Sequence, residues 1–517
     1  MRQIPATMST QHPDNASPAY WCNKSFLSTT DEIEEAYRAF EELGCDEYMW
    51  DWEGKFVDEA VIDKLLRRYE TYFKKNPLGK KKFLTYRIPN IWEERGYRLA
   101  RAFINILTSA DLASELKFHS PPIFEVILPM TKSHKQIFET DELFRRVARL
   151  KYEVFNPGKV IKFNHVEVIP LVERVEDLMN IDTILNPYLD SYKDHYQKMP
   201  EYIRPFIARS DPALNAGLIP AVLASKVAIS LLYKLQDRYG IPVYPIIGTG
   251  SLPFRGSVNP ENIHEAIKEY SGIRTVTIQS AFKYDYPIKT VQKALDFIKK
   301  TLPKLKPDML NDEEVEALKK ATPLFSKPYA ATIETLAPFI NHIASFIPAR
   351  RERMLHIGLF GYSRGMGKVR LPRAISFTGA LYSLGVPPEL IGTGRGLAAA
   401  AKKGLTEVIK RTYINLERDL IHAGKYLNKE NLELLAKQHP AFKDVQTDVL
   451  EIEKFLGREL GPHKNHHFLH RNTVSSIYYK LQMGADFSED IVAAAQMRKS
   501  LGGSNDEYPL RRQLLYQ

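Results

Sequence analysis

The chain has 517 residues, of which 44% are hydrophobic and 26% are charged. These proportions are typical of a folded globular protein and exclude a largely disordered one. The two cysteines, Cys22 and Cys45, exclude a disulfide-stapled secreted domain and indicate a reducing, cytoplasmic location. The net charge of +10 leaves three classes of partner open: nucleic acid, an anionic membrane surface, or small anionic substrates.

A short strand-like run over 6–10 opens the chain, and the polar turn after it holds a histidine in the sequence MSTQHPDNA. A His-Pro pair in such a turn does not build a core, so either the turn is ordinary or His12 has a chemical role. The next segment, STTDEIEEAYRAFEELGC, predicts a helix. Thr29 and Glu32 match a capping box, and Gly44 suits the left-handed position after the last turn.

Short β-rich runs alternate with helical segments through the first 280 residues. The runs lie at 6–10, 47–52, 83–88, 123–130, 166–173, 205–211, 242–250 and 274–280. Eight such units are the signature of a closed parallel (β/α)8 barrel of the TIM type, and a doubly wound open sheet is the alternative. From about residue 281 the pattern is mostly helical. We therefore expect one compact unit over 1–517, with barrel strands at approximately 5–280 and extensive additional helices, mostly over 281–517.

Two segments bear on the membrane and nucleic-acid classes. The most apolar one, LIPAVLASKVAISLLYKL, carries Lys226 at its centre and falls short of the roughly 20 clean apolar residues that a membrane span needs. We interpret it as a buried helix and expect no membrane association. The Lys-rich run over 74–83 has the composition of a solvated turn, and no recognised nucleic-acid module accompanies it. We therefore expect no nucleic acid as a partner.

Polar side chains gather where the predicted strands end. These positions are His12, Asp51, Glu53, Arg87, Glu173, Asp211, the loop over 248–256, and Gln279. Each has an ordinary explanation alone; Glu173, for example, precedes Arg174, and a structural ion pair would suffice. Because active sites of such barrels lie at the carboxyl ends of the strands, the shared position predicts a catalytic centre there.

Two candidate metal sites stand out. Glu173 and Asp211 come from different strands and suit Mg²⁺ or Mn²⁺, which prefer oxygen ligands and keep waters for a substrate to displace. The second candidate is HKNHHFLHR over 463–471, where histidines at i, i+3, i+4 and i+7 resemble a zinc-binding face. It lacks nearby cysteines and a suitably placed glutamate.

Three glycine-containing loops have the composition of anion-binding sites. They are GTGSLPFRG with Arg255, GYSRGMGKVRLPR with Arg364, Lys368, Arg370 and Arg373, and GTGRGL with Arg395. Guanidinium groups match phosphate and carboxylate geometry, and glycines permit a loop to close over a ligand. The ligand implied is small, phosphorylated and carboxylated, although flexible surface loops have the same composition.

Six motifs, in order, resemble those of the phosphoenolpyruvate carboxylase family: TQHPDN, PLVERVEDL, ARSDPALNAG, GTGSLPFRG, GYSRGMGKVRLPRAI and AAAQMRKSLGG. The short, archaeal-type form is the most similar, and the resemblance runs over 8–503. It implies an enzyme that joins phosphoenolpyruvate and bicarbonate to give oxaloacetate and phosphate with Mg²⁺ or Mn²⁺. It also implies a homotetramer, organised as a dimer of dimers.

The resemblance further implies roles for individual residues. Those matched to the catalytic machinery are His12, Arg87, Arg255, Arg364 and Arg373, and the last two bracket the mobile loop. The two metal carboxylates are matched by Glu173 and Asp211. Besides Arg87, Arg364 and Arg373, the residues expected to bind substrate are Thr249, Gly250, Lys368 and Gln279.

Some positions depart from the long-form enzymes of the family. Their His-Gly-Arg-Gly-Gly sequence reads IGTGS here, so their histidine and arginine become Ile247 and Thr249. Of the feedback-inhibitor pocket, Arg471 is recognisable, while Lys499 stands where the family has an asparagine. These two residues mark a candidate effector site.

Two other functions stay open at this point. A different barrel enzyme acting on phosphoenolpyruvate, such as a mutase or lyase, would share the metal and the anion loops and would not need bicarbonate. A basic protein that binds polyanions would explain the charge of +10 and would show salt-sensitive binding without turnover.

Overall fold

The computed structural model describes residues 3–52, 57–93, 96–118, 120–155, 163–351, 365–366 and 369–500. At its centre is a closed barrel of eight parallel strands in chain order, in which β8 pairs with β1. The strands are β1 Thr7–Ser9, β2 Glu47–Asp51, β3 Phe83–Arg87, β4 Glu125–Leu128, β5 Glu167–Val172, β6 Phe206–Ala208, β7 Ile246–Gly248 and β8 Thr275–Ile278. Each lies within the run predicted for it, so the (β/α)8 barrel is confirmed and the open sheet is excluded.

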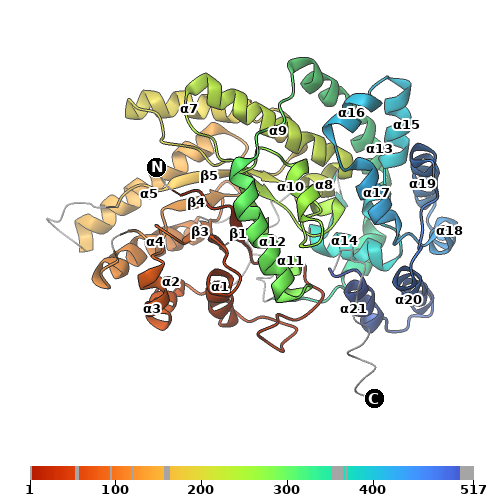
Figure 1. Cartoon of the computed structure of the whole chain (residues 1–517), viewed down its shortest axis with the longest axis horizontal. Coiled ribbons are helices and arrows are strands. Elements are labelled where there is room, and N and C mark those ends of the chain that lie inside the picture. Colours follow the sequence, from red (N-terminus) through yellow and green to blue (C-terminus); the bar gives the residue numbers. More distant parts are fainter. Residues whose placement is uncertain are drawn as a thin grey trace.

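Helices follow the strands and then continue beyond the barrel. In the barrel half they are α1 Asp31–Glu41, α2 Val61–Arg68, α3 Glu70–Lys75, α4 Tyr97–Glu115, α5 His134–Phe155, α6 Val175–Met179, α7 Asp182–Tyr196, α8 Ser210–Ala216, α9 Leu218–Tyr239, α10 Ile263–Glu269, α11 Ser280–Tyr284 and α12 Ile288–Thr301. The C-terminal half contains α13 Asp312–Ala344, α14 Ala374–Ser383, α15 Thr393–Lys402, α16 Thr406–Thr412, α17 Leu416–Gly424, α18 Lys429–Gln438, α19 Phe442–Leu456, α20 Asn465–Gln482 and α21 Ser488–Met497, with a small hairpin of β9 Gly365–Met366 and β10 Val369–Arg370. Figure 1 shows these later helices on the right, beside the barrel.

The interior of the barrel has an apolar layer and a charged layer. The apolar layer includes Met8, Met49, Ile127, Ile169, Leu171, Phe206, Ala208 and Ile246. At the amino ends of the strands, the fully buried Arg204 donates to Glu47 (2.8 Å) and Thr275 (3.1 Å) and pairs with Glu125. A buried guanidinium needs such carboxylate partners because leaving water is costly for a charge. The charged layer therefore fills the interior at the amino ends of the strands.

The apolar segment that begins at Leu218 forms α9, and its interpretation as a buried helix is confirmed. By length and composition alone it could cross a membrane, but 89% of its most apolar window is buried inside the protein. Its central Lys226 donates to the carbonyl oxygen of Glu269 (2.6 Å). The same hydrophobic cluster contains Ile207 of the barrel and Leu381 of α14, so the two halves of the chain share a core.

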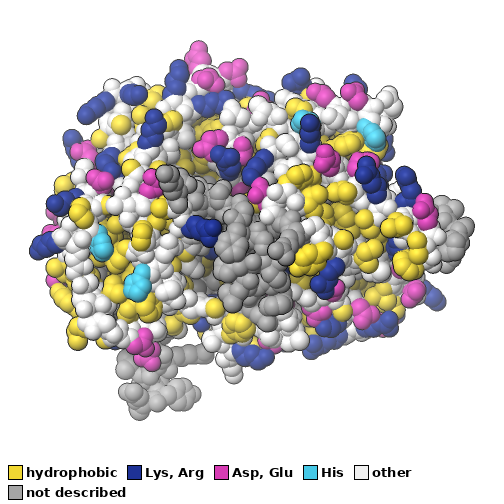
Figure 2. All heavy atoms as spheres, turned by 180° about the vertical axis from the view of Figure 1, so that it is seen from behind, with side chains coloured by type: hydrophobic (Ala, Val, Ile, Leu, Met, Phe, Trp, Pro, Cys, Tyr) yellow, Lys and Arg dark blue, Asp and Glu magenta, His cyan; other side chains and the backbone are white. Residues whose placement is uncertain are grey.

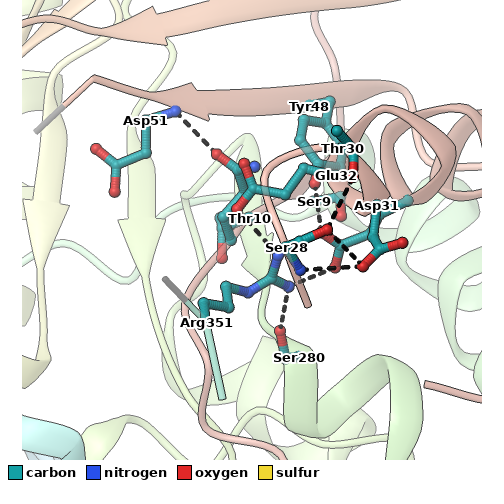
Figure 3. Close-up of polar contacts among 12 residues, drawn as sticks. Ser9, Thr10, Ser28, Thr30, Asp31, Glu32, Tyr48, Asp51, Ser280 and Arg351 are labelled. Carbon is teal, nitrogen blue, oxygen red and sulfur yellow. Dashed lines mark hydrogen bonds and ion pairs between the residues drawn. The ribbon is translucent and has the colours of Figure 1, made fainter. Parts of the chain in front are cut away.

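The start of α1 differs from the prediction. Its N-cap residue is Thr30, without a side-chain capping bond, so the capping box of Thr29 and Glu32 is wrong. Glu32 is buried and lies 3.5 Å from the guanidinium of Arg351. Its carboxylate therefore takes part in an interior ion pair and not in a capping hydrogen bond at the start of the helix. Asp31 instead accepts hydrogen bonds from the backbone N–H (3.0 Å) and hydroxyl (2.8 Å) of Ser28 (Figure 3).

Candidate active site

A cavity of about 270 Å³ opens at the carboxyl ends of the barrel strands. Its wall contains seven residues that the sequence had singled out: His12, Arg87, Glu173, Asp211, Arg255, Gln279 and Arg373. Six of them follow or end barrel strands, and Arg373 precedes α14. The structure thus brings together the side chains that the strand ends indicated, while their chemical roles stay predictions.

His12 lies in the turn that follows β1. Its Nδ1 is 3.0 Å from Oγ1 of Thr10, and its carbonyl oxygen accepts the backbone N–H groups of Asp14 (3.1 Å) and Ser280 (3.2 Å). These contacts fix both the ring and the backbone. When Nδ1–H donates to Thr10, Nε2 on the opposite edge of the ring is the basic nitrogen.

Asp14, in the same turn, connects the turn to the residues that follow β8. Asp14 accepts the N–H of Ala281 (2.7 Å) and the guanidinium of Arg255 (2.8 Å). The buried Asp285 accepts the N–H groups of residues 16 and 17 at 2.7–3.0 Å. The HPDN turn is therefore an anchored part of the cavity wall and not an ordinary surface loop.

Arg87 is oriented by a neighbouring strand. Its Nε and Nη2 donate to the two carboxylate oxygens of Asp51 at 2.9 and 2.6 Å, and both side chains are buried. The two residues are opposite each other in the β2–β3 ladder, so the barrel register itself forms the pair. The backbone N–H of Asp51 donates to Oε1 of Gln11 (3.0 Å). A bidentate carboxylate fixes the guanidinium plane and keeps it charged.

Arg255 is held by three groups from different elements. Its Nη1 donates to Asp14 (2.8 Å), its Nη2 to Oε1 of Gln279 (2.5 Å), and its Nε to Oγ of Ser210 (3.2 Å). A Cβ at Gly250 would lie 2.8 Å from this guanidinium, so only glycine leaves room for it. These contacts indicate that Arg255 positions the turn of His12 relative to Gln279 and to the start of α8.

Glu173 and Asp211 face the same cavity from β5 and from the first turn of α8. Oε2 of Glu173 accepts the N–H of Met130 at 2.6 Å, which fixes the carboxylate. Two protein carboxylates do not make a closed metal site. They do suit Mg²⁺, which is commonly held by one or two carboxylates together with waters and substrate oxygens. The donor set therefore fits the predicted ion.

The zinc interpretation of residues 463–471 is wrong. In the part of the chain that the structure describes, no group of three or more His, Cys, Asp or Glu side chains could hold a metal. His467 and His470 are buried and their rings pack against Tyr426, with centroids 5.5 and 4.8 Å apart. Burial and the nearby guanidinium of Arg498 hold the pKa of His470 well below its ordinary value. The helical spacing therefore reflects a face turned toward the core.

Other predicted substrate ligands have different positions. Thr249 and Gly250 do not contribute to the cavity wall formed by the described residues. Thr249 is fully buried, and its N–H donates to Oγ1 of Thr277 (2.8 Å), which does line the cavity. Glu53, Arg364 and Lys368 lie outside the described residues.

The GTGRGL loop binds an anion that belongs to the protein itself. Nε and Nη2 of Arg395 donate to Asp448 at 3.0 and 2.8 Å, and the N–H of Gly392 donates to the same carboxylate (2.7 Å). A Cβ at Gly394 would lie only 2.0 Å from the carbonyl oxygen of Asp448. The glycines of this loop therefore permit close packing of α15 on α19, and the predicted ligand-binding role of Arg395 is wrong.

The two candidate effector residues both lie near the C-terminus of the described chain. Lys499 is nine-tenths buried, its Nζ is 2.9 Å from Oε1 of Glu261, and it lies 5.0 Å from the ring centroid of Tyr286. The guanidinium of Arg471 lies over the ring of Phe468 at 5.4 Å. The effector role of Arg471 and Lys499 stays a prediction.

Sequence reasoning missed three arginines of the cavity wall, Arg209, Arg350 and Arg351. Arg209 directly follows β6 in the quoted motif ARSDPALNAG, so its position at a strand end was a usable signal. The other two follow α13 in a segment without a recognisable motif.

Arg351 forms a buried ion-pair network with α1 and α11. It makes two hydrogen bonds with Glu35, at 2.7 and 2.6 Å. A third, with Oγ of Ser280 at 3.2 Å, is drawn in Figure 3. Lys283 also donates to Glu35 (3.0 Å). Burial alone would raise the pKa of Glu35, but the charges of Arg351 and Lys283 hold it well below its ordinary value.

Comparison with known families decides the identity of this barrel. The sequence model of the family described as phosphoenolpyruvate carboxylase matches residues 4–502. The chain belongs to the phosphoenolpyruvate carboxylase family. It is therefore an enzyme of the carboxy-lyase class, as the motifs implied.

Relatives named phosphoenolpyruvate carboxylase align over most of both chains. The relative from Leuconostoc mesenteroides is 39% identical over 504 residues, which are 97% of this chain and 99% of that protein. The relative from Picrophilus torridus is 41% identical over 520 residues, 96% of this chain and 99% of that protein. The relative from Caldivirga maquilingensis is 42% identical over 448 residues, 84% and 85% of the two chains. The resemblance to the short, archaeal-type phosphoenolpyruvate carboxylases is thus confirmed.

The departure from the long-form phosphoenolpyruvate carboxylases lies at the end of β7. Ile247 is fully buried in the hydrophobic core. The hydroxyl of Thr249 is buried and has no hydrogen-bond partner within the described ranges. This part of the barrel rim therefore receives no charge from these two positions.

Proposed function

We propose that this enzyme carboxylates phosphoenolpyruvate with bicarbonate in the cavity at the barrel rim and requires Mg²⁺ or Mn²⁺. The observation that carries the proposal is the convergence of His12, the carboxylates Glu173 and Asp211, and several arginines on one small cavity. A cation held between the two carboxylates would allow an anionic substrate to bind beside them.

Glu173 and Asp211 would hold the divalent ion. When bound, the ion supplies Lewis-acid chemistry: it draws charge from the phosphate and enol oxygens of the substrate. Arg87 and Arg373 lie on the same wall and would bind the phosphate, with Arg364 and Lys368 as further expected ligands. Fixed guanidinium groups stabilise the charge that develops during transfer without having to reorganise.

The reaction then follows from the charges in the cavity. An oxygen of bicarbonate attacks phosphorus, the phosphorus–oxygen bond to the enol breaks, and carboxyphosphate and the pyruvate enolate form. Nε2 of His12 takes the proton of carboxyphosphate, which splits into carbon dioxide and phosphate, and the proton passes to phosphate. The enolate carbon attacks carbon dioxide, and this forms oxaloacetate. A ring fixed at Nδ1 by Thr10 is suited to this proton transfer because histidine titrates near neutral pH.

The activity is tested by coupling oxaloacetate formation to NADH oxidation with malate dehydrogenase, with phosphoenolpyruvate and Mg²⁺ present. Turnover that depends on bicarbonate supports the proposal. Turnover of phosphoenolpyruvate without bicarbonate would favour a mutase or lyase, and salt-sensitive anion binding with no turnover would favour a polyanion-binding protein. Against the last of these, Figure 2 shows acidic and basic side chains interspersed over the face that it presents, without a continuous basic surface there.

Replacing one metal carboxylate should raise the metal requirement. For Asp211→Asn we expect the Mg²⁺ concentration at half-maximal activity to rise by at least about tenfold, because the amide no longer offers an anionic ligand. Asp237→Asn, on the exposed surface of α9, is the matched control and should leave the requirement unchanged. An unaltered Mg²⁺ titration of the Asp211 variant would remove this residue from the ligand set.

We further propose a cytoplasmic location and a homotetramer. Both cysteines are without a disulfide, which agrees with a reducing compartment. Several large apolar side chains of α4 and α5 are exposed, namely Tyr97, Ile104, Leu150, Val154 and Phe155, and an interface between subunits would cover them. Sedimentation equilibrium tests the tetramer, and a monomer at micromolar concentration would contradict it.

A further inference from the structure

The cavity wall contains arginines whose charges the protein already neutralises. Arg87 pairs with Asp51, Arg255 with Asp14 and Arg351 with Glu35, each at 2.6–2.8 Å. Buried guanidinium groups are ordinarily matched in this way because an unpaired charge inside a protein is costly. The protein's own carboxylates therefore balance these three charges and fix the positions of the three guanidinium groups, including that of Arg87, which still lines the cavity.

Arg350 differs from its neighbours on the same wall. Only 8% of the surface of Arg350 is exposed. Its Nη2 donates to the carbonyl oxygen of Ala16 at 3.1 Å, while its buried Nε has no hydrogen-bond partner within the described chain. In the same ranges, no carboxylate lies within ion-pair distance of it. A guanidinium that is built into a cavity wall with one neutral partner retains its charge for a ligand.

Asp285 is the carboxylate with an electrostatic effect on Arg350, but within the described residues the two form no ion pair. Asp285 already accepts three hydrogen bonds from the N–H groups of residues 16 and 17. Burial raises the pKa of Asp285 to about 7. Burial also lowers the pKa of Arg350, and Asp285 offsets this only in part. An anion bound at Arg350 would relieve this cost.

The anchoring of Arg350 indicates which anion it receives. Ala16, whose carbonyl oxygen holds the guanidinium, belongs to the turn that carries His12, and both Arg350 and His12 line the cavity. Arg87 lies on β3, two strands from β1 in the barrel order, and is oriented by Asp51 of β2. The chain therefore offers a cation for the phosphate and a second cation beside the residue that receives the proton.

We propose that Arg350 binds bicarbonate and then the carboxylate of carboxyphosphate beside His12, an inference that rests on the proposed carboxylase function. Bicarbonate is a small planar anion, and its oxygens match the fork of a guanidinium better than the point charge of a lysine. Arg350 is thus a substrate-binding residue for the second substrate, and Arg351 beside it is a structural one.

The test compares the kinetic constants of Arg350→Gln for the two substrates. We expect the KM for bicarbonate to rise about 10–100-fold, the loss typical for a hydrogen bond to a charged group, while the KM for phosphoenolpyruvate changes less than about threefold. Arg350→Lys should recover part of the bicarbonate affinity. Arg458→Gln, at an exposed position just after α19, is the matched control and should change neither constant.

The outcomes separate this inference from the proposed function. An unchanged KM for bicarbonate, or an equal rise of both constants, overturns the assignment of Arg350. Absence of bicarbonate-dependent turnover in the unmodified enzyme would overturn the carboxylase proposal and this inference with it. If thermal melting shows that the Gln variant does not fold, Arg350→Lys decides by the same comparison, because it keeps the charge and loses only the fork.

Discussion

His12→Asn should abolish most oxaloacetate formation while phosphoenolpyruvate still binds. A positioned general base typically contributes about 10²–10⁴-fold to the rate, and we expect a loss of turnover in this range. Asparagine can keep a hydrogen bond to Thr10, so the turn should stay in place. Without a group to accept the proton of carboxyphosphate, the enolate is captured less often, and pyruvate should appear together with phosphate.

The measurement follows oxaloacetate, pyruvate and phosphate in parallel, together with the dissociation constant of phosphoenolpyruvate. His264→Asn, on the exposed side of α10, is the matched control because it removes an exposed imidazole that does not line the cavity. Equal losses of substrate affinity and of turnover in the His12 variant would show a structural histidine and contradict the role proposed for it.

Arg351→Met should lower the free energy of unfolding by about 3–5 kcal/mol, the usual cost of removing one partner of a buried ion pair. Glu35 would keep Lys283 and two tyrosine hydroxyls but lose both guanidinium hydrogen bonds. Because the folded-state pKa of Glu35 is depressed, its contribution is present above its unfolded pKa of about 4.3 and is lost as the pH falls below that value. The destabilisation should therefore be largest near neutral pH and shrink in acid.

Denaturant unfolding at several pH values measures this effect. The exposed pair of Arg67 and Asp63 is the matched control, and Arg67→Met should cost less than about 1 kcal/mol. In the double variant Glu35→Gln, Arg351→Met, position 35 no longer carries a charged carboxylate that has lost its guanidinium. It should therefore be less destabilised than the sum of the single variants. Additive losses would contradict the coupling of the two side chains.

The barrel could be predicted from the sequence because its signals are local. Each strand is a short β-rich run, and all but β4 end in a polar residue or directly precede one. Eight repetitions of the run leave few alternatives to closure. The residues at the rim could be found for the same reason, since Glu173 immediately follows β5 and Gln279 immediately follows β8. The position of a residue at a strand end can be predicted from the local sequence, without knowing which distant residues it contacts.

The errors arose where a local pattern has two physical explanations. Histidines at helical spacing form a metal-binding face or a buried face, and the packing of His467 and His470 on Tyr426 decides for the second. Glycine-rich loops bind a ligand or allow close packing, and Asp448 occupies the loop of Arg395. The capping box failed because Glu32 lies against Arg351, a residue more than 300 positions away.

Arg350 could not be found from the sequence because nothing near it in the chain distinguishes it from Arg351. The two are neighbours, yet Glu35 neutralises one and a backbone carbonyl holds the other. That difference depends on α1 and on the turn of His12, which the fold brings to the same wall. Contacts between segments that are distant in the sequence therefore decide whether an arginine is held in a structural ion pair or is left able to bind a ligand.

The most direct test of the account follows the oxygens of labelled bicarbonate. Bicarbonate uniformly labelled with oxygen-18 is supplied with phosphoenolpyruvate and Mg²⁺, and the products are analysed by mass spectrometry. If bicarbonate attacks phosphorus, phosphate carries one labelled oxygen and oxaloacetate carries two in its new carboxylate, because one bicarbonate oxygen passes to phosphorus. Phosphate without label, or phosphate and pyruvate formed equally well without bicarbonate, would contradict it.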